Sequence, residues 1–239
     1  MASGAGGLCA AILCGGAGKR LRKAVPGTPK PMAPVAGVPF LDFIIAYLLR
    51  SGVSDIVLCT GYRSGVIEKH YGRGIAGARI SFSREKRPLG TAGALKLAAA
   101  RIKSDPFLVL NGDSICAADL SRLLRFHLKK KAKATVVLTK NTGRSDVGAV
   151  VTDASGRVVK FSEKKGHGRG AFINAGIYLL DKKVLALIPE LRKYSLEYDL
   201  FPGLEGCFGF KSWAPLLDIG VPERYIMAEK ILKRKEALT

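Results

Sequence analysis

The sequence contains no uncharged apolar run of about 18 residues, the length that a membrane-spanning helix needs. The longest candidate, residues 40–49, is interrupted by Asp42 and has the spacing of an amphipathic helix. The N-terminal residues also lack the basic segment with which a secretory signal begins. We therefore expect no membrane partner, no signal peptide and a location in the cytoplasm.

Cysteine and histidine are both scarce, with five and three residues. The cysteines are odd in number and form no CxxC pair, which argues against a disulfide framework and against a zinc site. They suit a reducing cytoplasm instead. The histidines lie in two predicted helices and in a basic, glycine-rich loop. We expect His70, His127 and His167 to face solvent and to take no part in catalysis.

Acidic residues are also few. Asp and Glu total 19 against 39 Lys and Arg, which leaves a formal net charge of +20. Such an excess indicates an anionic partner, and a basic nucleic-acid-binding protein is one alternative, with contacts at residues 129–133 and 230–235. However, these basic runs lie at the ends of predicted helices, where cations interact favourably with the helix dipole. No aromatic residues alternate with them, as they do in single-strand binders. We therefore expect no nucleic-acid partner.

The chain of 239 residues has a hydrophobic fraction of 48%, which is ordinary for a globular protein. It contains no internal repeat and no linker rich in Pro, Gly or Ser. This length suits one α/β domain, so we expect residues 1–239 to form a single domain. A homo-oligomer of this domain is possible.

Strand and helix patterns alternate through the first 139 residues, in the order β-α-β-α-β-α-β-α-β. This order is typical of a doubly wound, mostly parallel, Rossmann-like α/β sheet. The expected strands are 8–14, 55–59, 79–83, 106–110 and 134–139, and the expected helices are 40–50, 64–71, 91–102 and 120–131.

The pattern changes after Thr139. Two predicted strands, 147–152 and 158–162, flank the sequence DASG at 153–156, whose residues favour a hairpin turn. A third strand is expected at 172–180, and helices are expected at 189–202 and 222–235. We therefore predict a small α+β portion, residues 140–239, appended to the α/β portion, residues 8–139.

Ligands of open α/β sheets bind beyond the carboxyl ends of the strands, so the loops that follow strands are informative. The first such loop is GGAGKRL at 15–21, whose glycine N–H groups and basic side chains suit a phosphate. It does not match a Walker A loop, because Leu13 and Arg20 stand where Gly and Ser or Thr are required. It does not match GxGxxG either, because Leu21 replaces the last glycine.

A second basic position follows. Lys30 lies between Pro29 and Pro31, which restrict its backbone. An ordinary solvated basic loop is the alternative interpretation at this stage.

Seven segments, in this order, resemble motifs of the sugar-1-phosphate nucleotidylyltransferases, also called NDP-sugar pyrophosphorylases. They are GGAGKRL with PKPM (15–21, 29–32), PLGTAG (88–93), NGD (111–113), FSEK (161–164), NAGIY (174–178), SLEYDLFP (195–202) and DIG (218–220). The sequence departs from the family pattern at Lys19, where Thr or a small residue is usual, and at Lys165, where Pro is usual.

The resemblance implies that a sugar 1-phosphate attacks the α-phosphate of a nucleoside triphosphate, with Mg²⁺ as cofactor and pyrophosphate as second product. It assigns catalysis to Arg20, Lys30, Asp113 and Asp218, and assigns the metal to the two aspartates. The expected nucleotide-binding residues are Leu13, Gly15, Gly16, Gly18, Lys19, Glu85, Pro88, Gly90, Thr91 and Asn111. The expected sugar-phosphate-binding residues are Gly148, Glu163, Lys164, Asn174 and Glu197. Residues 8–139 thus become the nucleotide-binding portion, and residues 140–239 the sugar-binding portion.

These assignments agree with the chemistry of the side chains. Two carboxylates suit Mg²⁺, which keeps water and phosphate oxygens as its other ligands. Arg20 can bind the β- and γ-phosphates with two N–H groups, and Lys30 is a point charge for the α-phosphate. Without the resemblance, Asp113 and Asn174 would be interpreted as turn residues.

The sugar and the base are less certain. The segments PKPMAPVAGVPFLDF and SLEYDLFP, and an end soon after Asp218 that leaves no room for the family's C-terminal β-helix, favour GTP and D-glycero-α-D-manno-heptose 1-phosphate. The product would then be GDP-heptose for a capsule or surface polysaccharide. Guanylyl transfer to mannose 1-phosphate and uridylyl transfer to N-acetylmuramate 1-phosphate are the alternatives. We expect Glu85 to accept hydrogen bonds from guanine N1–H and N2–H₂.

Overall fold

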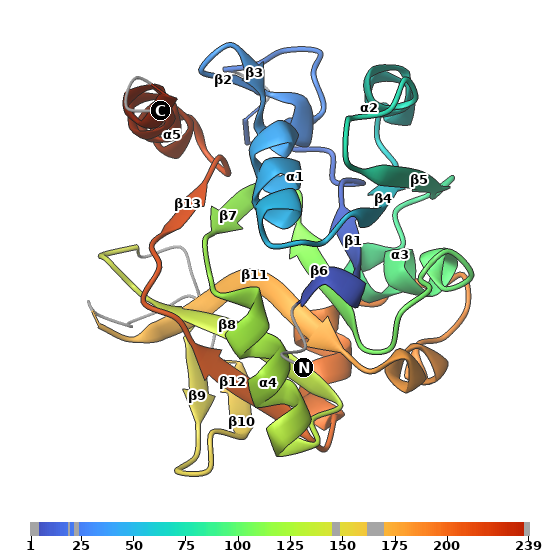
Figure 1. Ribbon diagram of the computed structural model, residues 1–239, viewed down its shortest axis with the longest axis vertical. Helices are drawn as coiled ribbons and strands as arrows, with labels where there is room; N and C mark the ends of the chain where they lie inside the picture. Colours follow the sequence, from blue (N-terminus) through green and yellow to red (C-terminus); the bar gives the residue numbers. More distant parts are fainter. Residues whose placement is uncertain (1–4, 19, 22–23, 145–148, 162–169, 237–239) are drawn as a thin grey trace.

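A seven-stranded mixed sheet forms the centre of the molecule (Figure 1). The computed structural model describes residues 5–18, 20–21, 24–144, 149–161 and 170–236. The strands lie in the order β12-β8-β11-β6-β1-β4-β5. Their bounds are β1 Cys9–Leu13, β4 Asp55–Thr60, β5 Arg79–Arg84, β6 Phe107–Asn111, β8 Ala134–Lys140, β11 Phe172–Leu180 and β12 Cys207–Lys211. Strand β11 runs antiparallel to both of its neighbours, and the other adjacent pairs are parallel. The predicted mostly parallel α/β sheet is therefore confirmed.

Five α-helices accompany the sheet in the described part of the chain: α1 Phe40–Arg50, α2 Ser64–Tyr71, α3 Gly90–Ala98, α4 Leu120–Lys130 and α5 Pro222–Glu236. Helices α1 and α4 contribute to a core cluster on one face of the sheet, and α3 contributes to a cluster on the opposite face. Strand β1 supplies alternate residues to both clusters, which is why its sequence is apolar throughout. No helix among the described residues is both long and apolar enough to cross a bilayer.

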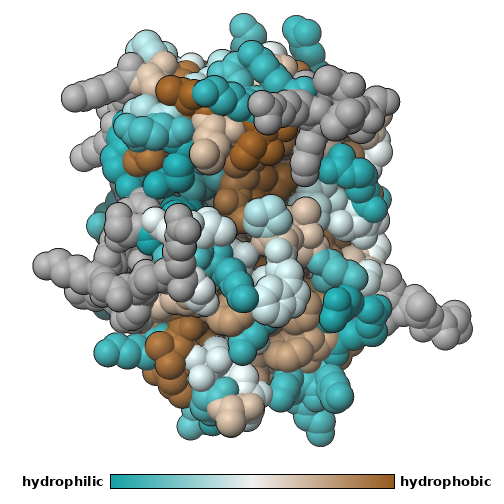
Figure 2. Space-filling model, turned by 90° about the vertical axis from the view of Figure 1, so that its left-hand side faces the viewer, coloured by the Kyte–Doolittle hydropathy of each residue, from teal (hydrophilic) through white to brown (hydrophobic). Residues whose placement is uncertain are grey.

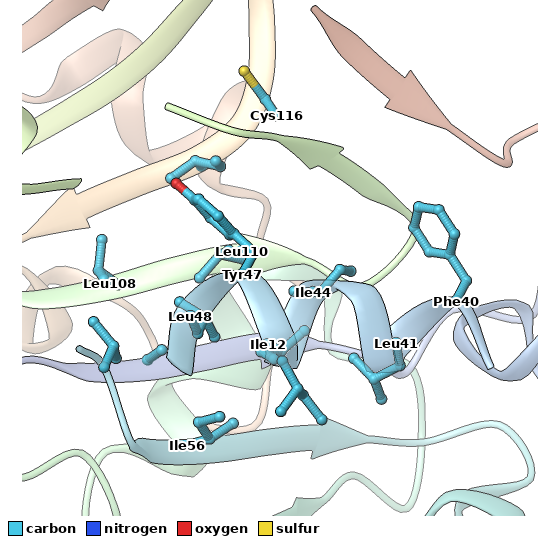
Figure 3. Close-up of a cluster of buried hydrophobic side chains, with 14 of the residues drawn as sticks. Ile12, Phe40, Leu41, Ile44, Tyr47, Leu48, Ile56, Leu108, Leu110 and Cys116 are labelled. Carbon is cyan, nitrogen blue, oxygen red and sulfur yellow. The ribbon is translucent and has the colours of Figure 1, made fainter. Parts of the chain in front are cut away.

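Helix α1 shows how sequence spacing produces this packing. Its buried residues recur at helical intervals, and Figure 3 shows Leu41, Ile44 and Leu48 facing Ile12 of the central strand β1. Each of these side chains is fully buried, and burying one such side chain contributes about 1.5–3 kcal/mol. The helix ends before Gly52, whose φ of +83° suits glycine.

The second half of the chain shares the sheet of the first half. Strand β11 lies between β8 and β6, and β12 extends the edge beside β8. Strands β9 (Val150–Thr152) and β10 (Val158–Phe161) form the predicted hairpin. Its turn is closed by Asp153, whose Oδ1 accepts from the N–H groups of Ser155 and Arg157. The two portions of the chain are therefore joined by strand pairing through the middle of one sheet.

Several short elements were not predicted from the sequence, because two or three residues are too few to show a hydrophobic periodicity. They are the hairpin of β2 (Pro34–Val35) and β3 (Val38–Pro39), and the antiparallel pair of β7 (Ser114–Cys116) and β13 (Leu216–Asp218). Strand β12 was also not predicted. Five short 3₁₀- or π-helical segments are also present among the described residues, at Ala5–Gly7, Lys30–Met32, Lys182–Leu187, Leu196–Leu200 and Phe201–Gly203.

The predicted helix over residues 189–202 is wrong. Leu191 has a φ of +50°, a left-handed conformation that interrupts a right-handed helix. The backbone N–H of Ser195 donates to Asp199 Oδ2 at 2.7 Å, and the residues that follow form one π-helical turn. Local hydrogen bonds from Ser and Asp side chains therefore replace regular helix here. The helix predicted at 91–102 also ends early, at Ala98.

The prediction that His127 faces solvent is wrong as well. Its ring is buried, with Nδ1 2.8 Å from Thr135 Oγ1 and Nε2 3.1 Å from Asp181 Oδ1. The position follows from helical spacing, because His127 shares the inner face of α4 with Leu123 and Leu124. His70 is exposed as predicted, and His167 lies outside the described residues.

The face of the molecule shown in Figure 2 is largely hydrophilic, with hydrophobic side chains visible in its upper half. Part of the exposed apolar surface of the chain belongs to α5, where Ile226, Met227 and Ile231 are exposed. The inner face of α5 instead buries Ala228 and Leu232. Isolated apolar side chains are ordinary on protein surfaces, and the homo-oligomer stays a prediction.

Burial of His127 predicts a pH-dependent loss of stability. Desolvation lowers the pKa of the imidazole below its ordinary value of 6.5, and Asp181 opposes this only in part. The unfolded chain therefore binds a proton before the folded chain does, so the free energy of unfolding falls as pH drops from 6.5 towards the folded pKa. We expect His127→Gln to remove this component in urea unfolding measured between pH 5 and pH 8 (about 1.5 units either side of the ordinary pKa).

The exposed His70 provides the control, and His70→Gln should keep the pH dependence of the wild type. Identical pH profiles for His127→Gln and the wild type would show that the buried ring does not cause the effect.

Candidate active site

The loops after β1, β4, β5 and β6 surround a cavity of about 600 Å³ at the carboxyl edge of the sheet. Since these four strands are parallel, their C-terminal loops meet at this edge. Eight of the predicted nucleotide-binding residues line the cavity: Leu13, Gly15, Gly16, Glu85, Pro88, Gly90, Thr91 and Asn111. The structure therefore brings together segments that are nearly 100 residues apart in the chain.

A second cavity, of about 270 Å³, contains the predicted phosphate-binding cations. It is lined by Gly18, Arg20, Lys30 and Gly220. Asp113 lines both cavities, so the two meet at this carboxylate. The larger cavity thus adjoins a smaller, basic one, and Asp113 belongs to the lining of both.

Glycines in the first cavity make room for Glu85. A Cβ atom at Gly15 would lie 2.5 Å from Glu85 Oε1, and one at Gly61 would lie 2.6 Å from the same oxygen. The other oxygen, Oε2, accepts from the backbone N–H of Leu89 at 3.0 Å. Burial raises the pKa of the Glu85 carboxyl above its ordinary value. Gly61 was missed in the sequence analysis, although it lies two residues after the end of the predicted strand 55–59 and directly after β4.

The N-terminus of α3 is held by the segment before the π-helical turn. Gly90 has a φ of +74°, and a Cβ atom there would lie 2.6 Å from the carbonyl oxygen of Tyr194. That carbonyl accepts from the N–H groups of Ala92 and Gly93. Only glycine fits both the conformation and the contact at position 90, which explains the glycine of the PLGTAG motif.

A hydrogen-bond network connects predicted nucleotide and sugar residues. Glu197 Oε2 accepts from Thr91 Oγ1 at 3.1 Å and from Ser195 Oγ at 2.9 Å, and its Oε1 accepts from Tyr178 Oη at 2.6 Å. Tyr178 Oη in turn accepts from Asn174 Nδ2 at 2.8 Å. Burial and the neighbouring Glu197 raise the pKa of Tyr178 well above its ordinary value, so the phenol remains a donor.

Asn174 also shapes the backbone of β11. Its Oδ1 accepts from Gly176 N at 2.9 Å, and the strand changes register between Asn174 and Tyr178. Gly176 has a φ of +72°, and a Cβ atom there would lie 2.7 Å from Asn111 Nδ2. Asn174 therefore stabilises a bulge within β11, next to the end of β6, and its predicted contact with the sugar phosphate stays a prediction.

The two predicted metal ligands lie next to each other. Asp113 follows β6, and Asp218 ends β13, which pairs with β7 so that Asp218 faces Ser114. The backbone N–H of Ile219 donates to the carbonyl oxygen of Asp113 at 3.0 Å. Lys30 Nζ donates to Asp113 Oδ2. This pairing of short strands brings together carboxylates that lie more than 100 residues apart in the sequence.

Two arginines that no motif indicated contact Asp218. Arg224 Nε donates to Asp218 Oδ1 at 2.8 Å, and Arg144 Nη1 lies 2.7 Å from Asp218 Oδ2. The N–H of Gly220 also donates to Oδ1, at 2.8 Å. The Asp218 side chain is only 9% exposed. A buried carboxylate requires such partners, but nothing in the sequence identifies which arginines provide them.

The donor set fits magnesium. The described residues contain no group of three or more His, Cys, Asp or Glu side chains of the kind that encloses zinc. Two neighbouring carboxylates are typical of Mg²⁺ sites in which water and phosphate complete the coordination. Asp218 Oδ2 is buried and accepts no well-aligned hydrogen bond from the described residues. This oxygen therefore has unused capacity to bind a cation.

Four predicted site residues lie outside the described residues: Lys19, Gly148, Glu163 and Lys164. Their assignments stay predictions.

Comparisons with known proteins agree with this geometry. A family model described as "Nucleotidyl transferase" matches residues 9–204. The chain is 37% identical to the D-glycero-α-D-manno-heptose 1-phosphate guanylyltransferase of Aneurinibacillus thermoaerophilus, over 94% of this chain and 98% of that enzyme. It is 36% identical to the mannose-1-phosphate guanylyltransferase of Mycobacterium tuberculosis, over 94% of this chain but only 64% of that enzyme.

Solved structures show the same similarity. HddC from Yersinia pseudotuberculosis, complexed with GMP-PN, superimposes with a TM-score of 0.85 at 31% identity. The match covers 95% of this chain and 100% of HddC. The similarity thus extends over nearly the whole sheet and both cavities.

Proposed function

Since the chain belongs to the nucleotidyl transferase family and is a sugar-1-phosphate guanylyltransferase, we propose that its sugar substrate is D-glycero-α-D-manno-heptose 1-phosphate. The reaction with GTP then gives GDP-heptose and pyrophosphate. The observation that carries this proposal is the 37% identity to a heptose 1-phosphate guanylyltransferase over 98% of that enzyme. Mannose 1-phosphate is the second candidate, because the identity to a mannose-1-phosphate guanylyltransferase is nearly as high.

Guanine is recognised, in this proposal, by the Glu85 carboxylate. Guanine N1–H and N2–H₂ are adjacent donors and match a carboxylate, whereas uracil offers a single N–H between two carbonyl groups. Glu85 lines the larger cavity, where its Oε1 lies beside the backbone of Gly15 and Gly61 while its Oε2 accepts from Leu89 N. This supports guanylyl transfer over the uridylyl alternative.

In this proposal, the smaller cavity binds the phosphates of GTP. Arg20, in this cavity, binds the β- and γ-phosphates. Lys30, whose ammonium group pairs with Asp113 in this structure, provides positive charge for the α-phosphate. The sugar phosphate oxygen attacks the α-phosphorus and pyrophosphate leaves, so the protein supplies orientation and positive charge rather than a covalent nucleophile. Asp113 and Asp218 would hold Mg²⁺, which neutralises charge on the phosphate oxygens.

We further propose that the enzyme works in the cytoplasm, with its product directed to a capsule or surface polysaccharide. All five cysteines are buried and free, which suits a reducing compartment.

A substrate panel tests the proposed function. Purified enzyme is incubated with GTP and one of three sugar 1-phosphates, of heptose, mannose or N-acetylmuramate, and pyrophosphate release is measured. We expect the highest kcat/KM with the heptose. A higher kcat/KM with mannose 1-phosphate would move the assignment to that sugar.

The base preference has its own test. Glu85→Gln places an amide donor opposite the guanine donors, so we expect kcat/KM for GTP to fall about tenfold or more, in line with about 1–3 kcal/mol for a bidentate base contact. The exposed Glu205 is the control, and Glu205→Gln should leave kcat/KM unchanged. Equal pyrophosphate release from UTP and GTP by the wild type would exclude guanine selection by Glu85.

The role of Asp113 predicts a different result. Asp113→Asn removes one metal ligand and the partner of Lys30, so we expect pyrophosphate release to fall about 100-fold or more at saturating magnesium. Thermal unfolding followed by circular dichroism should still show a cooperative transition. An active variant with the magnesium dependence of the wild type would refute the assignment of Asp113.

A further inference from the structure

The turn after β8 directs a cation towards the active site. Asn141 is buried, and its Oδ1 accepts from the backbone N–H groups of Gly143 and Arg144, at 3.1 Å and 2.7 Å. Its Nδ2 donates to the carbonyl oxygen of Arg144 at 2.9 Å. Three hydrogen bonds from one buried side chain therefore fix the backbone from which Arg144 extends to Asp218.

The two oxygens of Asp218 are bound differently. Oδ1 accepts two well-aligned hydrogen bonds, from Arg224 Nε and from Gly220 N. Oδ2 lies 2.7 Å from Arg144 Nη1, but this contact lacks the alignment of a hydrogen bond. Hydrogen bonds weaken steeply when misaligned, so the Arg144 contact depends mainly on charge. At Asp218, the contact with Arg144 is therefore the less directional of the two arginine contacts.

The charges around Asp113 and Asp218 show why a positively charged side chain such as Arg144 is needed there. Asp113 and Asp218 are neighbours, so their negative charges repel each other unless cations lie beside them. Among the described residues, the cations that pair with these two carboxylates are Lys30, Arg144 and Arg224, which gives three positive charges to two negative ones. A bare divalent cation that approaches this cluster meets a net positive charge, whereas a cation bound to a triphosphate does not.

The position of Arg144 in the fold points to the second substrate. Arg144 follows β8, whose Leu138 pairs with Asn174 of β11, the strand of the predicted sugar site. Arg20 and Lys30 come instead from the segment after β1, which β11 and β6 separate from β8 in the sheet. Arg144 is therefore the cation at Asp218 whose strand pairs directly with β11.

We propose that Arg144 is an exchangeable counter-ion: it neutralises Asp218 in the free enzyme, leaves it when the metal binds with the nucleotide, and then binds the phosphate of the sugar 1-phosphate. This inference rests on the proposed function. The exchange keeps Asp218 paired at every stage and brings a positive charge to the attacking phosphate only when the nucleotide is in place.

The first test is metal binding to the free enzyme. Mn²⁺ is titrated into protein without substrates, and free Mn²⁺ is measured by electron paramagnetic resonance. Because Arg144→Gln removes the competing charge, we expect this variant to bind Mn²⁺ about tenfold more tightly than the wild type, and Arg144→Lys to resemble the wild type. The control Arg125→Gln removes one exposed charge on α4 and should leave Mn²⁺ affinity unchanged. Unchanged or weaker Mn²⁺ binding by Arg144→Gln would overturn the proposal, because a purely structural arginine predicts that result.

The second test compares the effect of the same substitution on the KM for the sugar 1-phosphate and on the KM for GTP. For Arg144→Gln we expect the KM for the sugar 1-phosphate to rise about tenfold or more, and the KM for GTP to stay within about twofold. Arg144→Lys should recover part of the loss. An unchanged KM for the sugar phosphate, or an equal rise in both KM values, would contradict the proposal. These measurements use whichever of heptose 1-phosphate and mannose 1-phosphate the wild type converts. A wrong sugar assignment is then detected with the wild type alone. A wrong role for Arg144 is detected only by comparing the variants with the wild type.

Discussion

The pairing of β7 with β13 is the contact on which the active site depends. It places Asp218 opposite Ser114 and ties the backbone of Ile219 to that of Asp113, so that two carboxylates become neighbours. Neighbouring carboxylates repel each other, and nearby cations offset that repulsion. Lys30, Arg144 and Arg224 provide that compensation, and the same positive charge prepares the site for two polyanionic substrates.

Strand β11 gives the molecule a single sheet in place of two separate units. It crosses the middle of the sheet between β6 and β8, and its bulge at Gly176 faces the end of β6. From this strand the hydrogen bonds of Tyr178 continue through Glu197 to Thr91 at the nucleotide cavity. Because a well-satisfied buried network resists rearrangement, the two halves of the site are held in one geometry.

Elements with long periodic patterns were predictable, and elements stabilised by single contacts were not. Helix α1 follows its pattern from first to last residue, because its apolar spacing and the glycine after it act together. The helix expected at 189–202 fails at Leu191, where local side-chain hydrogen bonds outweigh the weak helical pattern. His127 was misplaced because nothing in the sequence identifies the partners that satisfy its ring, Thr135 and Asp181, which come from other parts of the fold.

The sequence by itself determined the α/β class and the chain order of the first five long strands, because these depend on hydrophobic periodicity. The residues that line both cavities were predicted from the resemblance of seven segments to family motifs, and periodicity alone did not identify them. The tertiary structure alone decided that Asp113 and Asp218 meet, that β11 joins the two portions, and that Arg144 and Arg224 hold Asp218. Those contacts join residues far apart in the chain. The sequence does not indicate which distant charged residue will contact which carboxylate. That pairing is decided only when the strands and the turns between them have been arranged in space.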